Sequence, residues 1–131
     1  MDTLEAELLL CANAEPGLRR DLEQILELTR KILSCEVLSQ PLEWQTLCGM
    51  TEAEIRTRSH RPQDFYHQPH FMPQPTDGPA ILRLNRCRTA ARHTELIATG
   101  ALPDRQDLLQ ALNRISSMIY ILQIRQKAQR S

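Results

Sequence analysis

The sequence predicts an all-α protein, and three observations support this. Only 4% of the residues are aromatic although 41% are hydrophobic, so the core must consist mainly of Leu, Ile and Ala. These residues favour helices over a β-sandwich or barrel. Apolar residues recur with helical spacing in four long stretches, and Gly and Pro residues separate the stretches. We therefore predict an antiparallel up-and-down bundle of four main helices, forming one domain over residues 1–131.

The first two predicted helices cover residues 2–14 and 16 to about 37. In the first, Leu4, Leu8 and Cys11 keep helical spacing. The break at Glu15-Pro16-Gly17 ends it, and Pro16 suits the first turn of the next helix because that turn needs no backbone donor. The second helix carries a wide apolar stripe, made of Leu18, Leu22, Ile25, Leu26, Leu28, Ile32 and Leu33.

Residues 39–78 are predicted to form a long connection. It holds most of the prolines and three of the four histidines. Thr51-Glu52-Ala53-Glu54 matches a capping box, which predicts a short helix near residues 52–58. The stretch from Arg61 to Pro79 is expected to be irregular, and a loop of this length is usually functional or partly disordered. Trp44 is expected to anchor the connection by packing.

The third helix is predicted over residues 79–98, with Pro79 in its first turn and Gly100 as its C-terminal stop. Its mixed stripe contains Ile81, Leu84, Cys87 or Arg88, Ala91, Leu96 and Ile97.

The fourth helix is predicted from Pro103-Asp104 to about residue 127, and we expect Lys127 to Ser131 to fray. It has a coiled-coil-like seam of Leu108, Leu112, Ile115, Ile119 and Leu122. Further apolar surface comes from Met118, Tyr120, Ile121 and Ile124. Because a helix that is apolar on several sides must be covered on several sides, this suggests a subunit interface.

Charge and composition exclude several classes of function. Sixteen basic and sixteen acidic residues cancel, so no electrostatic footprint for nucleic acid is present. No apolar run approaches a membrane span, and the acidic N-terminus lacks the basic region of a signal peptide. We expect a cytoplasmic protein. The four cysteines are scattered, which favours buried free thiols over disulfides or metal ligands.

Polar stripes on the third and fourth helices are the candidate functional feature. Arg88, Arg92 and Glu95 share one face of the third helix, and the fourth carries a stripe of Asn113, Ser116 and Ser117. Two arginines four residues apart repel one another, and Glu95 can relieve only Arg92. A bound anion such as a phosphate would account for the stripe; the alternative is a solvated helix face.

These stretches resemble a known family. Cys87-Arg88-Thr89-Ala90-Ala91-Arg92 and Leu112-Asn113-Arg114-Ile115-Ser116-Ser117 are similar to the last two helices of the ATP:corrinoid adenosyltransferases of the propanediol- and ethanolamine-utilisation types. The ethanolamine type is the closer, and the similarity is to its C-terminal domain. Four further segments carry this similarity: Gln40-Pro41-Leu42, Gly49-Met50-Thr51-Glu52, Ser59-His60-Arg61-Pro62 and Pro103-Asp104.

The resemblance implies a trimeric helical bundle that binds ATP and corrinoid where subunits meet. In that family, a Co(I) centre in cobalamin without its lower axial ligand attacks the 5′ carbon of ATP and expels triphosphate. Since cobalt is the nucleophile, no side chain is assigned as a covalent catalyst. The resemblance implies Mg²⁺ and assigns cofactor binding to Arg88, Arg92, Glu95 and Asn113. It also implies a cobalamin-dependent ammonia-lyase or a bacterial microcompartment as partners.

The chain also departs from the family pattern. Thr89 and Ala91 replace an arginine and a glutamate of the propanediol type, and the separate glycines form no Thr-, Gly- and Asp-containing phosphate loop. The metal-binding His and Cys cluster of the ethanolamine type is also absent. Either an N-terminal part is missing, or another chain supplies it, or the protein no longer catalyses.

Three functions therefore compete. We favour an ATP:corrinoid adenosyltransferase or its C-terminal domain. The alternatives are a non-catalytic corrinoid- or nucleotide-binding or assembly bundle, and a plain oligomerisation module. For Asn113 the alternative role is a bond between helices, and Arg114 could pair with Asp107 or another subunit.

The long connection leaves two questions open. We assign no resident metal, although His60, His67 and His70 could bind a transition metal. The loop also concentrates Phe65, Tyr66 and Phe71. These aromatic rings could cover a corrin face and exclude water, or they could fix the loop to the bundle by burial.

Overall fold

The computed structural model describes residues 1–130, and that part of the chain contains helices but no β-strand; Leu47 and Met50 form an isolated bridge. The all-α prediction is confirmed. The elements are α1 (Asp2–Ala14), the 3-10 turn η1 (Pro16–Leu18), α2 (Arg19–Val37), α3 (Glu52–His60), α4 (Pro62–Tyr66), α5 (Pro79–Ala101) and α6 (Gln106–Arg130).

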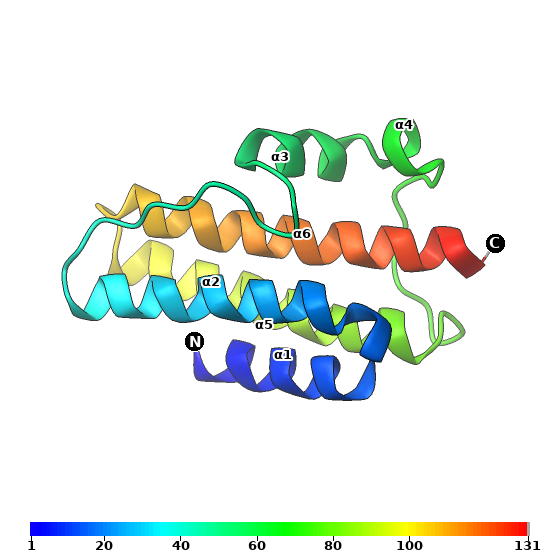
Figure 1. Cartoon of the computed structure of the whole chain (residues 1–131), viewed down its shortest axis with the longest axis horizontal. Coiled ribbons are helices and arrows are strands. Elements are labelled where there is room, and N and C mark those ends of the chain that lie inside the picture. The colour runs from blue at the N-terminus through cyan, green and yellow to red at the C-terminus, as the bar shows by residue number, and fades with distance from the viewer. Residues whose placement is uncertain (131) are drawn as a thin grey trace.

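The long helices α1, α2, α5 and α6 pack side by side, and Figure 1 shows α3 and α4 on the outer side of α6. Helices joined by a short turn run in opposite directions, but α2 and α5 run in the same direction (Figure 1). The strict alternation of an up-and-down bundle is therefore not confirmed. The reason is the connection of residues 39–78, which returns along the bundle before α5 begins.

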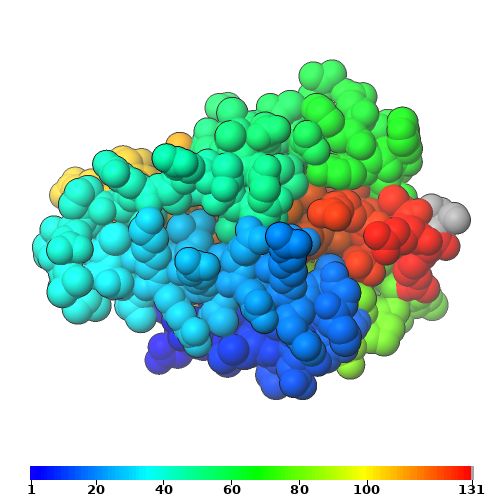
Figure 2. All heavy atoms as spheres, in the orientation of Figure 1, coloured from blue at the N-terminus to red at the C-terminus, as the bar shows by residue number. Residues whose placement is uncertain are grey.

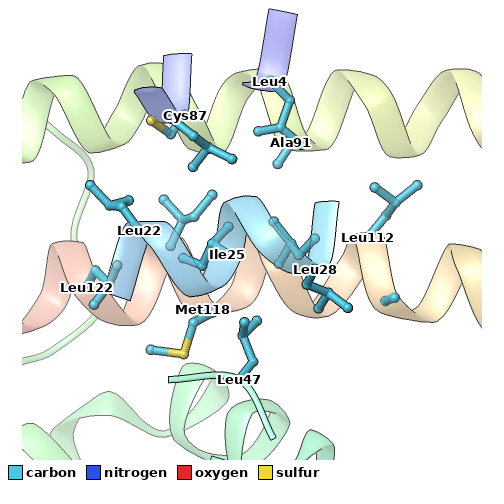
Figure 3. Packing of buried hydrophobic residues seen from close by; sticks show 14 of the residues in the cluster. Leu4, Leu22, Ile25, Leu28, Leu47, Cys87, Ala91, Leu112, Met118 and Leu122 are labelled. Atoms are coloured by element: carbon cyan, nitrogen blue, oxygen red, sulfur yellow. The ribbon is translucent and has the colours of Figure 1, made fainter. Parts of the chain in front are cut away.

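The core lies between the four long helices. It contains the predicted apolar positions of α1 and α2, including Leu4, Leu8, Leu22 and Ile25, each with 0% exposure. Figure 3 shows how residues of α2, α5 and α6 meet in this core. The seam predicted on α6 is also buried, from Leu108 to Leu122.

A second apolar side of α6 is covered by the chain itself. Met118 is fully buried, and its side chain and that of Leu47 point toward one another in Figure 3. In Figure 2, the connection before α3 fills the surface between α2 and α3. The extra apolar surface of α6 therefore does not call for a partner subunit. The homotrimer stays a prediction that follows from the family resemblance.

The helices differ from the prediction in three respects. Helix α5 passes through Gly100 to Ala101, so Gly100 is not the stop. Leu96 and Ile97, which were predicted to belong to the apolar stripe, are 71% and 58% exposed. The last buried residue of α5 is Thr94. Helix α4 begins at Pro62, within the stretch from Arg61 to Pro79 that was expected to be irregular.

The end of α6 does not fray over residues 127–130, contrary to the prediction; Ser131 lies outside the described residues. Lys127 forms an ion pair with Asp77, which is 3% exposed. Arg130 donates to the carbonyl oxygen of Thr76 at 3.1 Å. Its guanidinium also occupies the space where a Cβ of Gly78 would be, and Gly78 has a φ of 91°. These contacts hold the C-terminal turns of α6 against the loop before α5.

Other local predictions are confirmed. Thr51 and Glu54 form the reciprocal capping box at the start of α3, which ends at His60 rather than near residue 58. All four cysteines are free thiols, although Cys48 is only partly buried. Trp44 is half-buried and packs against the core.

Within residues 1–130, no helix combines the length and the apolar character that crossing a bilayer requires.

Candidate functional site

A cavity of about 450 Å³ opens between α5, α6 and the loop that follows α4. It is lined by Ser59, His60, His70, Phe71, Met72, Arg88, Ser116, Ser117 and Tyr120. Arg88 comes from the predicted stripe of α5, and Ser116 and Ser117 come from the stripe of α6. The structure therefore brings one end of each stripe together around a single hollow.

Arg88 is the cation of this cavity. Its guanidinium carbon lies 4.6 Å from the ring centroid of Tyr120, and its buried Nε has no hydrogen-bond partner within residues 1–130. Burial lowers the pKa of Arg88, and the neighbouring charge of Arg92 lowers it further. An arginine nevertheless stays protonated at neutral pH. The free-energy cost of burying the Arg88 guanidinium would fall if an anion occupied the cavity.

Neither Arg88 nor Arg92 forms an ion pair with an acidic side chain in the described part of the chain. Arg92 is exposed and lines a second hollow with His93, Glu95, Leu96 and Thr99. The expected relief of Arg92 by Glu95 is thus not seen. Two uncompensated cations one helical turn apart favour an anionic ligand.

Glu95 bonds to Asn113 instead. The Nδ2 of Asn113 donates to Oε2 of Glu95 at 3.0 Å. The Oδ1 of Asn113 accepts from Arg114, and Arg114 pairs with Glu52 at the start of α3 at 2.6 Å. Arg114 therefore does not pair with Asp107, which binds Arg105. These contacts join α5, α6 and α3 beside the arginine stripe.

The four predicted binding residues thus line three separate hollows. Arg88 lines the first cavity, Arg92 and Glu95 line the second, and Glu95 and Asn113 line a third. Only Glu95 and Asn113 contact one another. A ligand that touches all four must therefore extend along α5 across these three hollows.

The histidines of the connection separate into two groups. His60 and His70 line the same cavity as Arg88, and the Nε2 of His70 lies 3.1 Å from the carbonyl oxygen of His60. His67 is exposed and ends α4 with a φ of 55°. No three His, Cys, Asp or Glu residues within residues 1–130 are grouped to hold a metal ion. The structure therefore assigns these histidines no shared metal position.

The aromatic residues of the connection also differ in their surroundings. Phe71 is half-buried and stacks on Tyr120 with ring centroids 6.4 Å apart. Phe65 is 42% exposed and lies under the guanidinium of Arg58 at 5.1 Å. Tyr66 packs against the core. Phe71 and Tyr66 therefore hold the loop by burial. The 80% exposed Met72 leaves apolar surface at the cavity, whereas Phe65 does not line it.

Tyr120 is the main residue that sequence reasoning missed. The helical pattern assigned it to apolar covering surface, but its hydroxyl contacts His70 and Phe71 and its ring contacts Arg88. One signal was available in the sequence. Tyr120 lies three and four residues beyond Ser117 and Ser116, so it belongs to the same face of α6 as the polar stripe.

Comparison with known proteins gives the family. The sequence model of the cobalamin adenosyltransferase family matches residues 1–125. The corrinoid adenosyltransferase EutT of Salmonella typhimurium (strain LT2) is 33% identical over 99 residues, which cover 71% of this chain and 37% of that protein. EutT of Escherichia coli K12 is 32% identical over the same shares. No solved structure matches.

The chain covers 37% of the length of these curated relatives. The family model nevertheless extends over nearly all of the chain and includes every predicted binding residue. The resemblance inferred from the two helical stretches is confirmed, and the protein belongs to the cobalamin adenosyltransferase family.

Proposed function

We propose that this chain provides the nucleotide- and corrinoid-binding helical domain of an ATP:corrinoid adenosyltransferase. The reaction transfers the 5′-deoxyadenosyl group of ATP to Co(I) of the corrinoid, with release of triphosphate. The proposal treats residues 1–131 as one domain, and it includes the homotrimer inferred from the family. The proposal also includes a role in ethanolamine utilisation, in the cytoplasm or a bacterial microcompartment, as the family resemblance suggests.

The observation that carries the proposal is the pair of uncompensated arginines on α5. Arg88 and Arg92 have no acidic partner in the described residues, and the Nε of Arg88 is buried beside the serines of α6. A triphosphate would supply the missing negative charge. Arginine suits this role because its planar donors match phosphate oxygens.

The proposed roles follow from each residue's remaining hydrogen-bonding capacity. Arg88 and Arg92 bind phosphate oxygens of ATP, and Ser116 and Ser117 offer hydroxyls to the same ligand. Asn113 has one free amide hydrogen after its bond to Glu95, and this hydrogen contacts the ribose or adenine. Glu95 acts on the nucleotide by orienting Asn113.

The proposal includes Mg²⁺ as the ion that accompanies the triphosphate. Within residues 1–130 no cluster of His, Cys, Asp or Glu side chains is arranged to bind a metal, so we assign no residue of this chain as its ligand. Phosphate oxygens and water are the ligands that Mg²⁺ commonly keeps at such sites. The protein residues contribute positioning and charge neutralisation.

The test measures Mg-ATP affinity by calorimetry and product formation by the visible spectrum, with reduced cobalamin under anaerobic conditions. Arg88→Ala and Arg92→Ala should each weaken ATP binding about tenfold or more, since a hydrogen bond to a charged group contributes roughly 1.5–3 kcal/mol. Arg30→Ala is the matched control, because Arg30 is an exposed arginine of α2 that lines no cavity of the site. It should stay within twofold of the wild type.

Three outcomes separate the possibilities. Formation of adenosylcobalamin above the no-protein control supports the enzyme. If neither arginine substitution changes ATP binding, the proposed site is wrong, and the nucleotide is bound by other residues. A folded wild-type chain that binds neither ATP nor corrinoid would reject the proposed function.

A non-catalytic nucleotide- or corrinoid-binding bundle is the second candidate. It is favoured by the lack of a Thr-, Gly- and Asp-containing phosphate loop among these 131 residues, because fewer groups are then present to hold the triphosphate for reaction. This candidate predicts ligand binding without conversion in the same assay.

A further inference from the structure

Tyr120 lies where the arginine stripe meets the loop of residues 67–78. It is half-buried, and it lines the 450 Å³ cavity together with Arg88 and Phe71. It is the only aromatic residue of α6. Its ring and its hydroxyl make different kinds of contact, so their effects can be separated by substitution.

The ring of Tyr120 holds the guanidinium of Arg88, whose central carbon is 4.6 Å from the ring centroid. An aromatic face attracts a cation without neutralising it. A carboxylate at this position would take up the N–H donors of Arg88 and cancel its charge. The contact with Tyr120 instead fixes the side chain and leaves the buried Nε without a partner within residues 1–130, available to an anion.

The hydroxyl of Tyr120 holds the loop. The backbone N–H of Phe71 donates to it at 3.3 Å, and it lies 2.9 Å from Nδ1 of His70. The other ring nitrogen of His70 donates to the carbonyl oxygen of His60, because a carbonyl only accepts. In the neutral imidazole Nδ1 is therefore the acceptor, and the hydroxyl of Tyr120 donates to it.

The rings of the loop add to this attachment. The imidazole of His70 stacks on Tyr120 with centroids 5.7 Å apart and an interplanar angle of 10°. Phe71 stacks at 6.4 Å and 19°. Two consecutive loop residues thus pack around one side chain of α6, at the rim of the cavity that contains Arg88.

We propose that Tyr120 is a positioning residue that couples the anion-binding arginine to the loop covering the site. The ring sets the orientation of Arg88, and the hydroxyl sets the place of His70 and Phe71. The inference rests on the proposed function for its effect on ATP. The attachment of the loop can be measured without any turnover.

Two substitutions of Tyr120 separate the two contacts. Tyr120→Phe keeps the ring and removes the hydroxyl. We expect the amide of Phe71 to exchange with solvent at least fivefold faster, measured by NMR, while Mg-ATP affinity stays within twofold. Tyr120→Leu also removes the ring, and Mg-ATP affinity should then fall at least fivefold.

Tyr66→Phe is the matched control, because the hydroxyl of Tyr66 is buried and has no hydrogen-bond partner among residues 1–130. It should change neither readout. Unchanged exchange at Phe71 in Tyr120→Phe would overturn the role of the hydroxyl. Equal losses of ATP affinity in the Phe and Leu variants would overturn the role of the ring. If the Leu variant folds poorly, Tyr120→Met, which also lacks the ring, makes the same comparison.

The two proposals fail in different ways. If the wild-type chain binds no Mg-ATP, the proposed function fails, and the positioning of Arg88 fails with it. Faster exchange at Phe71 in Tyr120→Phe would then still establish the hydroxyl as the attachment of the loop. If the wild type binds Mg-ATP and both variants of Tyr120 behave like it in both readouts, only the inference about Tyr120 fails.

Discussion

The amide of Asn113 on α6 donates a 3.0 Å hydrogen bond to the carboxylate of Glu95 on α5. The two residues are 18 positions apart in the sequence, and both were predicted to bind the nucleotide. Their contact means that Glu95 fixes the direction in which Asn113 presents its remaining donor.

Substitutions of Glu95 should separate its hydrogen bond from its charge. The carbonyl oxygen of Gln can still accept from Asn113, so Glu95→Gln should keep Mg-ATP affinity within twofold. Glu95→Ala breaks the bond, and it should weaken ATP binding as much as Asn113→Ala does and lower the free energy of unfolding by about 1 kcal/mol. Calorimetry and urea unfolding measure the two effects. Equal losses in the Gln and Ala variants would mean that the charge of Glu95 is what matters.

Leu47→Ala should destabilise the protein by about 2–5 kcal/mol, the usual cost of removing a buried leucine side chain. Leu47 is 2% exposed and lies against the side of α6 that carries Met118. Leu96→Ala is the control, since Leu96 is 71% exposed, and it should change the free energy of unfolding by no more than about 0.5 kcal/mol. If Leu47→Ala is equally mild, the connection does not cover α6 in solution.

Asp107 should make the free energy of unfolding depend on pH in the acidic range. Hydrogen bonds from Arg105 and from the backbone N–H of Leu42 lower the pKa of Asp107 to about 2. A carboxyl with a lowered pKa contributes stability that is complete above its unfolded value, roughly 3.9, and is lost as the pH falls through the folded value. The destabilisation caused by Asp107→Asn at pH 7 should therefore shrink between about pH 5 and pH 2.

Urea unfolding at several pH values measures this effect. Asp104→Asn serves as the control, because Asp104 is exposed and makes no ion pair within residues 1–130. A difference between wild type and Asp107→Asn that is constant from pH 7 to pH 3 would contradict the assignment.

The native cysteines should react slowly with iodoacetamide at pH 8. Three thiols are buried, and burial together with the charge of Asp21 raises the pKa of the partly buried Cys48 to about 12. Since the thiolate is the reactive form, Cys48 should label slowly despite its partial exposure. All four should label readily in urea. Fast labelling of Cys48 in the folded protein, located by mass spectrometry, would show that its thiolate is accessible.

The helices could be predicted largely because their signals are local. Pro16 separates α1 from α2, and Thr51 with Glu54 caps α3. Gly100 misled the prediction because an exposed glycine in a last turn costs only about 1 kcal/mol, which the packing of α5 on α6 can outweigh. The partner of Met118 could not be predicted, since Leu47 reaches it through a connection without periodicity.

The site was only partly predictable for the same reason. Helical spacing placed Arg88 and Arg92 on one face, and it placed Asn113, Ser116 and Ser117 on another. It could not reveal that Asn113 would bond to Glu95, because that contact depends on the relative register of α5 and α6. Nor could it place His70 beside Tyr120, because no repeat governs the path of the loop.

The C-terminal turns of α6 also fix the position of the loop that precedes α5. Tyr120, Lys127 and Arg130 contact the loop at Phe71, Asp77 and Thr76, over about 15 Å of helix at 1.5 Å per residue. Unwinding these turns would release the loop from the cavity, and lifting the loop would leave Lys127 and Arg130 without their partners. The C-terminal turns of α6 and residues 70–78 should therefore open and close as one cooperative unit in native-state hydrogen exchange. Access of a ligand to Arg88 on α5 would then depend on the stability of the C-terminal end of α6.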